Sequence, residues 1–231
     1  MNTEMTFHTE SEIEAEIMVD EVGKPEPEPS PQPKPKSIPK WTPHKCKHIV
    51  IIGAGGVGFY LTLALMAEGL DQDVTVYDQD TFVGGNGHRR LPRVNNPRLK
   101  KVDMLKATCQ VTFGYEMPKT VPYYFTVPDA SKLNSTYLVV DASDMPFQER
   151  LSIWDAFTKT GAKGIRVSYD GNGIVCLAYG PPFSPPDDQG GYDRMPSTAQ
   201  SFLAGGAGCQ FIKALLNGLN PQEMQIELSD R

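Results

Sequence analysis

Cysteine is scarce in this 231-residue chain, and its few cysteines do not form the spacing of a ligand set. The four thiols are far apart and contain no CxxC pair; they belong to Cys46, Cys109, Cys176 and Cys209. Structural zinc sites and disulfide frameworks both need closely or regularly spaced cysteines. We therefore expect reduced thiols, no zinc, and a cytoplasmic protein without a secretory signal peptide.

Long apolar runs and basic blocks are also missing. The longest apolar runs, around residues 49–54 and 136–140, are much shorter than the roughly 20 residues that a membrane-spanning helix needs. The formal net charge is −6, and no cluster of Lys and Arg could follow a phosphate backbone. Neither a membrane nor a nucleic acid is expected as a partner.

The first part of the chain differs in composition from the rest. It is acidic and then dense in proline, with the stretch KPEPEPSPQPKPK, and such a sequence buries too little apolar surface to offset its ordering entropy. We predict a disordered tail over residues 1–44, acting as a solvated linker rather than as a PxxP-type ligand. Residues 45–231 are long enough for one domain, since a domain usually takes roughly 100 to 200 residues.

Short β-branched runs alternate with helical apolar spacing after the tail. Strands are predicted at residues 48–52, 73–78, 120–127, 136–141, 164–169 and 173–179, the last two forming a hairpin. Helices are predicted at residues 57–69, 97–113, 146–160 and 197–216. This alternation predicts an α/β fold with a Rossmann-like, doubly wound, mainly parallel sheet and helices on both faces.

A glycine-rich turn, GAGGVG over residues 53–58, follows the first predicted strand and precedes a predicted helix. In this context GxGxxG lets the chain turn sharply and aims a helix N-terminus at a phosphate. Asp78, at the end of the second strand, is placed to accept hydrogen bonds from ribose hydroxyls. The turn predicts a nucleotide site but does not specify the nucleotide, and glycines that merely permit tight packing are the alternative.

Further polar residues follow Asp78 in a characteristic spacing. Asp80, Asn86 and Arg89 lie within DQDTFVGGNGHRR, and Lys100-Lys101 and Asp141-Ala-Ser-Asp144 come later. Together with the glycine turn, this pattern resembles the ThiF/MoeB and ubiquitin-activating enzyme superfamily from about residue 47 to 218. The compact length is similar to that of a prokaryotic, phage or plasmid member.

The resemblance implies ATP- and Mg²⁺-dependent adenylation of a C-terminal carboxylate, typically the terminal glycine of a ubiquitin-like or sulfur-carrier protein, by a homodimer. Arg89 and Lys101 would clamp phosphates during catalysis, and Asp144 would hold Mg²⁺. Lys101 is favoured over Lys100 because the family lysine precedes a small or apolar residue, here Val102. The implied nucleotide ligands are Gly53, Gly55, Gly56, Gly58, Asp78, Asp80, Asn86, Arg89, Lys101 and Asp141.

Departures from the family pattern leave other functions open. Met145 replaces the asparagine of DxxDN, and the proline-rich tail stands in place of an N-terminal helix with an arginine. An NAD(P)-dependent oxidoreductase and a non-catalytic scaffold that binds nucleotide or a ubiquitin-like protein are the alternatives. Asp141 and Asp144 could serve only as caps of a strand and a helix. The sequence leaves open the identity of the carrier and any catalytic use of Cys176 or Cys209.

Overall fold

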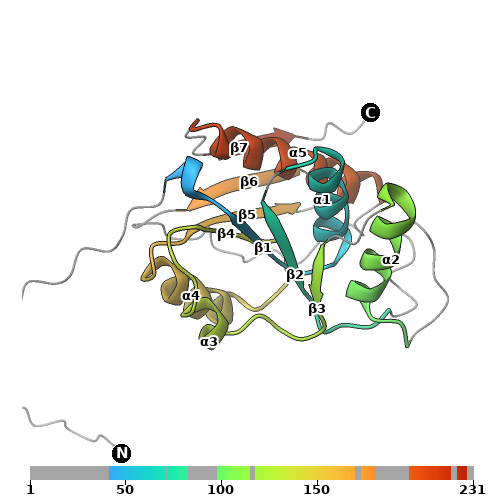
Figure 1. Ribbon diagram of the computed structural model, residues 1–231, viewed down its shortest axis with the longest axis horizontal. Helices are drawn as coiled ribbons and strands as arrows, with labels where there is room; N and C mark the ends of the chain where they lie inside the picture. Colours follow the sequence, from blue (N-terminus) through green and yellow to red (C-terminus); the bar gives the residue numbers. More distant parts are fainter. Residues whose placement is uncertain are drawn as a thin grey trace, which may run out of the picture. The chain divides into compact units, whose positions relative to one another are not determined.

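A computed structural model describes residues 42–70, 72–82, 98–114, 118–169, 173–179, 198–219 and 223–227 (Figure 1). Its centre is a seven-stranded sheet with the order β3-β2-β1-β4-β5-β6-β7. The strands are β1 His48–Ile52, β2 Asp73–Tyr77, β3 Lys119–Val121, β4 Tyr137–Asp141, β5 Lys163–Tyr169, β6 Gly173–Tyr179 and β7 Glu223–Glu227. Strands β1 to β5 pair in parallel, whereas β6 and β7 pair antiparallel.

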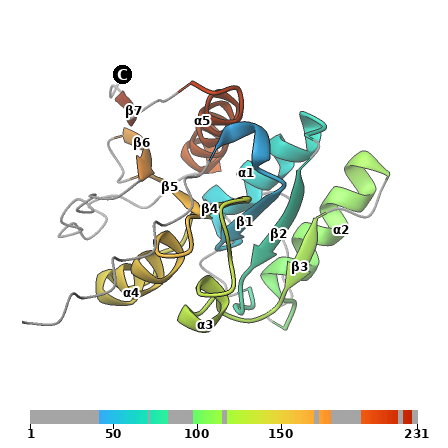
Figure 2. The same cartoon turned by 60° about the vertical axis from the view of Figure 1, so that its left-hand side comes forward.

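Helices cover both faces of this sheet (Figure 2). They are α1 Gly56–Ala67, α2 Lys101–Phe113, α3 Val127–Ala130, α4 Phe147–Thr158 and α5 Thr198–Leu216, preceded by a 3-10 turn, η1, at Pro43–Lys45. One core cluster joins the sheet to α1, α2 and α5, and a second joins the opposite face to α3 and α4. The predicted α/β, mainly parallel fold is therefore confirmed. None of the described helices combines the length and apolarity needed to cross a membrane.

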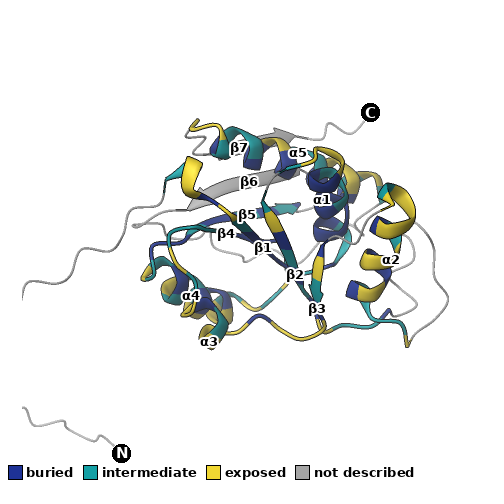
Figure 3. Cartoon of the chain, viewed as in Figure 1, coloured by how far each residue is buried: buried dark blue, intermediate teal, exposed yellow. Residues whose placement is uncertain are grey.

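Strand β1 consists of an unbroken apolar run after His48 because both of its faces are buried. Ile49 and Ile51 face the cluster of α1, α2 and α5, while Val50 and Ile52 face the cluster of α3 and α4. Because both faces of a central parallel strand are buried, alternation of polar and apolar residues is lost. The buried colouring of Figure 3 follows this strand and the inward sides of the helices.

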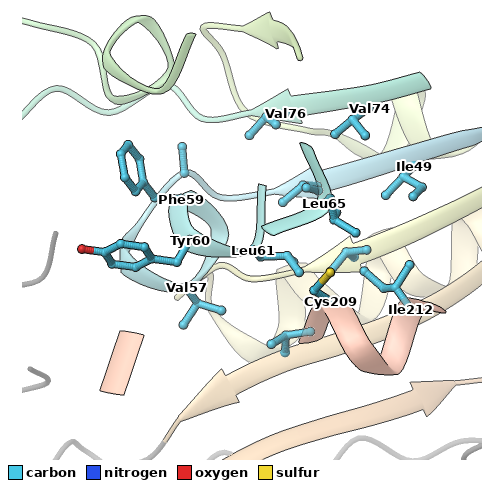
Figure 4. Packing of buried hydrophobic residues seen from close by; sticks show 14 of the residues in the cluster. Ile49, Val57, Phe59, Tyr60, Leu61, Leu65, Val74, Val76, Cys209 and Ile212 are labelled. Atoms are coloured by element: carbon cyan, nitrogen blue, oxygen red, sulfur yellow. The ribbon is translucent and has the colours of Figure 1, made fainter. Parts of the chain in front are cut away.

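Helices α1 and α5 pack closely because α5 carries small residues where they meet. A Cβ at Gly205 would come within 2.6 Å of the Leu61 backbone nitrogen and 2.7 Å of the Tyr60 carbonyl carbon. Cys209 lies one turn further along α5 and belongs to the same core cluster as Leu61 and Leu65 (Figure 4). Close contact between the two helix backbones thus fixes α1, which begins at the glycine turn.

The predicted strand over residues 120–127 was wrong for most of its length. Strand β3 ends at Val121, and α3 begins at Val127. The Thr126 side chain donates to Asp129 Oδ2 (2.6 Å), and the same oxygen accepts the Thr126 N–H (3.1 Å). This capping box, with Pro128 in the first turn, starts a helix where aromatic and β-branched residues had indicated a strand.

Two further boundaries differ from the sequence expectation. The strand β7 was not predicted, and α2 begins at Lys101 rather than near residue 97. Residues 98–100 are not helical, because Phe82 N–H donates to Leu99 O (3.0 Å) and Thr81 bridges Lys100. The tail predicted over residues 1–44 lies outside the described residues up to residue 41, and its last residues enter the 3-10 turn.

Two adjacent glycines of α5 test this helix packing. Gly205→Ala is expected to lower the free energy of unfolding by about 2 kcal/mol, because its Cβ would meet the backbone of α1. Gly206→Ala is the matched control, since its Cβ would meet no atom within 4 Å from the described residues outside its own stretch of helix, and it should raise stability by up to about 1 kcal/mol through helix propensity. Urea denaturation followed by circular dichroism measures both. Equal effects would contradict the close packing of α1 and α5.

Candidate functional site

The glycine turn is held tightly at two of its positions. Gly53 has φ +97°, and a Cβ there would lie 2.9 Å from the Ala142 carbonyl oxygen. A Cβ at Gly58 would overlap the carbonyl oxygen of Gly53. These two glycines are therefore required by the fold itself, before any ligand is considered.

Gly55 differs from these two positions. Its backbone is extended (φ −66°, ψ −163°) and it caps the N-terminus of α1. Apart from its chain neighbours, no atom of the described residues would lie within 4 Å of a Cβ there. The protein thus leaves open space at the start of a 12-residue helix, where backbone N–H groups and the helix dipole favour an anion. This combination is what close approach of a phosphate requires.

Asp78 connects the glycine turn to the end of β2. Its Oδ2 accepts the Ala54 N–H (2.7 Å) and its Oδ1 accepts the Asp80 N–H (2.8 Å). Burial raises the pKa of this carboxyl, and the neighbouring Lys101 cation acts in the opposite direction. Each carboxylate oxygen can accept more than one hydrogen bond, so Asp78 retains capacity for a ribose hydroxyl.

The lysine pair at the start of α2 divides into two different environments. Lys101 Nζ lies 2.6 Å from Asp80 Oδ2, and its backbone N–H donates to the Asp80 carbonyl (2.9 Å). Lys100 instead donates to the Gln79 carbonyl at an exposed position. Lys101 is thus the lysine of the pair that lies beside Asp78 and Asp80, and its role as a phosphate ligand stays a prediction.

Asp141 lies at the end of β4 in a buried cluster of charges. Its side chain is 1% exposed, and Oδ2 pairs with Arg150 Nε (2.8 Å) and Arg166 Nη1 (3.1 Å). Its Oδ1 accepts the N–H and hydroxyl of Ser143 (3.0 and 2.7 Å). The carboxylate therefore organises the protein around it, and the predicted role as a nucleotide ligand has no direct support in this geometry.

Asp144 lies in the segment that connects β4 to α4, residues 142–146, and is exposed. The segment contacts the glycine turn, because the Ala142 N–H donates to the Ile52 carbonyl (2.9 Å). An exposed carboxylate next to a glycine turn of this kind suits Mg²⁺, which prefers oxygen ligands and keeps several waters. In the described part of the chain, no three or more acidic, His or Cys side chains form a metal-ligand group.

Several predicted site residues lie outside the described residues. Asn86 and Arg89 fall in the stretch 83–97, so their predicted phosphate contacts remain predictions.

Cys209 is buried in the core, and burial raises the pKa of its thiol to about 11. Such a thiol is a poor nucleophile, which argues against a catalytic role for Cys209.

Two functional candidates, Arg150 and Arg166, were missed by the sequence reasoning. Arg150 shares helical spacing with Ile153 and Phe157, which face the core of α4. A cation on the apolar face of a helix indicates a buried ion pair, so this signal was available. The sequence did not show that Asp141 is the partner of these arginines. Arg166, for example, becomes the neighbour of Asp141 only through the β4–β5 register.

Comparisons with known proteins identify similar structures but no similar sequences. No protein-family model and no curated protein matches this sequence. Escherichia coli MccB with ATP matches with a TM-score of 0.63 at 14% identity, covering 80% of this chain and 61% of that chain. E. coli MccB with AMPCPP and MccA gives 0.63 at 13% identity, with 80% and 62% coverage.

The structure of PaaA matches with a TM-score of 0.59 at 18% identity, covering 81% of this chain and 62% of that chain. At these identities the likeness shows a shared fold. This chain spans less than two thirds of the length of each of these three structures.

The different demands on the glycines can be tested by stability measurements. Gly58→Ala is expected to cost about 3 kcal/mol, because the new Cβ would overlap the Gly53 carbonyl oxygen. Gly55→Ala should cost less than about 1 kcal/mol, since its Cβ enters open space and only N-cap preference changes. Guanidinium denaturation of both variants measures the difference. A severe loss in Gly55→Ala would show that the space at the turn is not open.

The buried thiols predict slow chemical modification. Burial raises the pKa values of Cys46, Cys109 and Cys209 to about 11 each, so at pH 8 roughly one thiol in a thousand is ionised. Iodoacetamide should label these three cysteines in the unfolded chain but not in the folded chain within the same time. Mass spectrometry of tryptic peptides measures each site separately. Rapid labelling of Cys209 in the folded protein would contradict its burial.

Proposed function

We propose that this domain is an ATP- and Mg²⁺-dependent adenylyltransferase that activates the C-terminal carboxylate of a protein or peptide. The observation that carries the proposal is the open space at Gly55, at the N-terminus of α1, with Asp78 and Lys101 beside the turn. The open space at Gly55 suits a phosphate, Asp78 can accept a hydrogen bond from a ribose hydroxyl, and Lys101 can balance the charge of a phosphate.

The position of these residues in the sheet supports a ligand site. Strand β1 lies between β2 and β4, so the order of the strands reverses at this point. Ligands of open α/β sheets bind at such a switch point, beyond the carboxyl ends of the strands. The glycine turn follows β1, Asp78 follows β2, and the segment with Asp144 follows β4. All three therefore belong to one edge of the sheet.

The proposed reaction demands cations and positioning more than a protein nucleophile. A carboxylate oxygen of the substrate attacks the α-phosphorus of ATP, the bond to the β-phosphate oxygen breaks, and pyrophosphate leaves. Because negative charge approaches a negative centre, Lys101 and Arg89 would stabilise it together with Mg²⁺ held by Asp144. Asp78 would orient the ribose, Asn86 would contact phosphate, and the turn would hold the phosphates.

The similar structures support both the use of ATP and the choice of a protein or peptide as the substrate. MccB of E. coli shares the fold, and its structures include one with ATP and one with AMPCPP and MccA. For this chain, a ubiquitin-like or sulfur-carrier protein with a C-terminal glycine is the proposed partner. A homodimer and a cytoplasmic location are proposed with it. The resemblance of the sequence to the ThiF/MoeB superfamily supports these finer statements.

Nucleotide binding is tested first by thermal shift. ATP with Mg²⁺ should stabilise the protein, by about 2.7 kcal/mol at a hundredfold excess over Kd. The shift should require Mg²⁺, fall sharply in Asp144→Ala, and shrink in Lys101→Met because a phosphate counter-charge is lost. Lys100→Met is the matched control, since this lysine donates to the Gln79 carbonyl at an exposed position, and it should keep the shift.

The other arms of this experiment separate the alternative functions. Stabilisation by NAD⁺ alone would overturn the proposal in favour of a dinucleotide-binding oxidoreductase. An Mg²⁺-dependent ATP shift that persists in Asp144→Ala would remove the metal role of this residue. Binding of ATP without pyrophosphate release, across peptides and carrier proteins that end in glycine, would favour a scaffold.

A further inference from the structure

Asp144 lies in the segment between β4 and α4. One side chain from α4, the helix that follows, contacts both ends of this segment. Arg150 Nε lies 2.8 Å from Asp141 Oδ2, at the start of the segment. Its Nη2 donates to the Met145 carbonyl (2.9 Å), near the end of the segment. One guanidinium group thus connects both ends of the short stretch on which Asp144 lies.

This connection is buried. Asp141 is 1% exposed and Arg150 is 3% exposed. The second cation of the cluster, Arg166, comes from β5 and pairs with the same oxygen, Oδ2. Buried ion pairs are weakly screened by solvent, and removing one partner of such a pair costs far more than at the surface. The cluster is therefore a rigid base for the segment.

The segment is also attached to the glycine turn. Ala142 donates to the Ile52 carbonyl (2.9 Å), and its own carbonyl faces the Gly53 position at 2.9 Å from a Cβ built there. Ser143 holds Asp141 Oδ1 through its N–H and hydroxyl. Because Asp144 follows directly, its location relative to the phosphate-binding turn depends on these contacts.

We propose that Arg150 is a positioning residue, which sets the location of Asp144 by fixing residues 142–146 between Asp141 and the Met145 carbonyl. The role of Asp144 toward Mg²⁺ and ATP rests on the proposed function, whereas the fixing of the segment does not. Arg150 lies in α4, one turn into the helix, and touches neither nucleotide nor metal in this role.

The geometry requires arginine at this position. A guanidinium group is a planar fork that can pair with a carboxylate at Nε while Nη2 donates a hydrogen bond to a second acceptor, whereas a lysine offers one compact ammonium group. Arg150→Lys therefore keeps the charge beside Asp141 but cannot keep both contacts. Arg166→Lys is the matched control, because it makes the same exchange on the same carboxylate oxygen and leaves the Arg150 fork intact.

Hydrogen exchange of the nucleotide-free protein tests the fixing of the segment. In Arg150→Lys the amides of residues 142–145 should exchange roughly tenfold faster or more, because the segment opens locally. Amides of β1 and α1 should keep their rates, and Arg166→Lys should alter the segment less. Equal acceleration in both lysine variants, or none in Arg150→Lys, would overturn the proposal. If Arg150→Lys does not fold, Ser143→Ala, which loses the hydroxyl bond to Asp141, should accelerate the same amides.

A double-mutant cycle tests whether Arg150 acts through Asp144. Arg150→Lys should weaken Mg²⁺-ATP binding roughly tenfold, and it should add little in the Asp144→Ala background, because residues of one network are not additive. If the loss of Mg²⁺-ATP affinity in Arg150→Lys adds fully to the loss in Asp144→Ala, this role is overturned. Failure of the unaltered protein to bind Mg²⁺-ATP would overturn the proposed function instead, and the exchange result would still decide whether Arg150 fixes the segment.

Discussion

Helix α1 starts so close to the end of β1 that a side chain at Gly58 would overlap the carbonyl oxygen of Gly53. This contact holds the helix N-terminus directly at the carboxyl edge of the sheet. It places the Ala54 N–H against the Asp78 carboxylate and turns Gly53 toward the segment after β4. At the other side of the helix, the small residues of α5 also allow a close approach. The position of the proposed phosphate site is thus fixed by absent side chains on both sides of α1.

The same edge of the sheet concentrates buried negative charge, and the protein compensates the two carboxylates differently. Asp78 receives two backbone N–H groups and one nearby lysine, and burial still raises its pKa. Asp141 receives two guanidinium groups and a serine. The first carboxylate keeps hydrogen-bonding capacity for a ligand, whereas the second is committed to internal structure. The two aspartates at these neighbouring strand ends therefore have different surroundings, because different groups compensate their charge.

The sequence was informative where a single stretch of chain determines the structure. The apolar run at residues 48–52 and the glycines after it have local causes, so strand, turn and helix followed from them. The region 120–127 failed because the local cap at Thr126 outweighed strand propensity. At the site, the position of Asp78 at the end of the second strand was predictable from its spacing after the glycine turn. The cluster of Asp141 and Arg150 was not, because strand register and helix packing bring its members together.

Several contacts of the site join residues that are distant along the chain. Ala54 bonds to a residue 24 positions away, Lys101 to one 21 positions away, and Arg166 to one 25 positions away. Such contacts form only after parallel strands have paired, and pairing of this kind is slow because loop closure must precede it. The contacts of Ala54 with Asp78 and of Arg166 with Asp141 therefore depend on the paired sheet. A nascent or truncated chain that ends before β5 has the glycine turn in its sequence but lacks the second cation that holds Asp141.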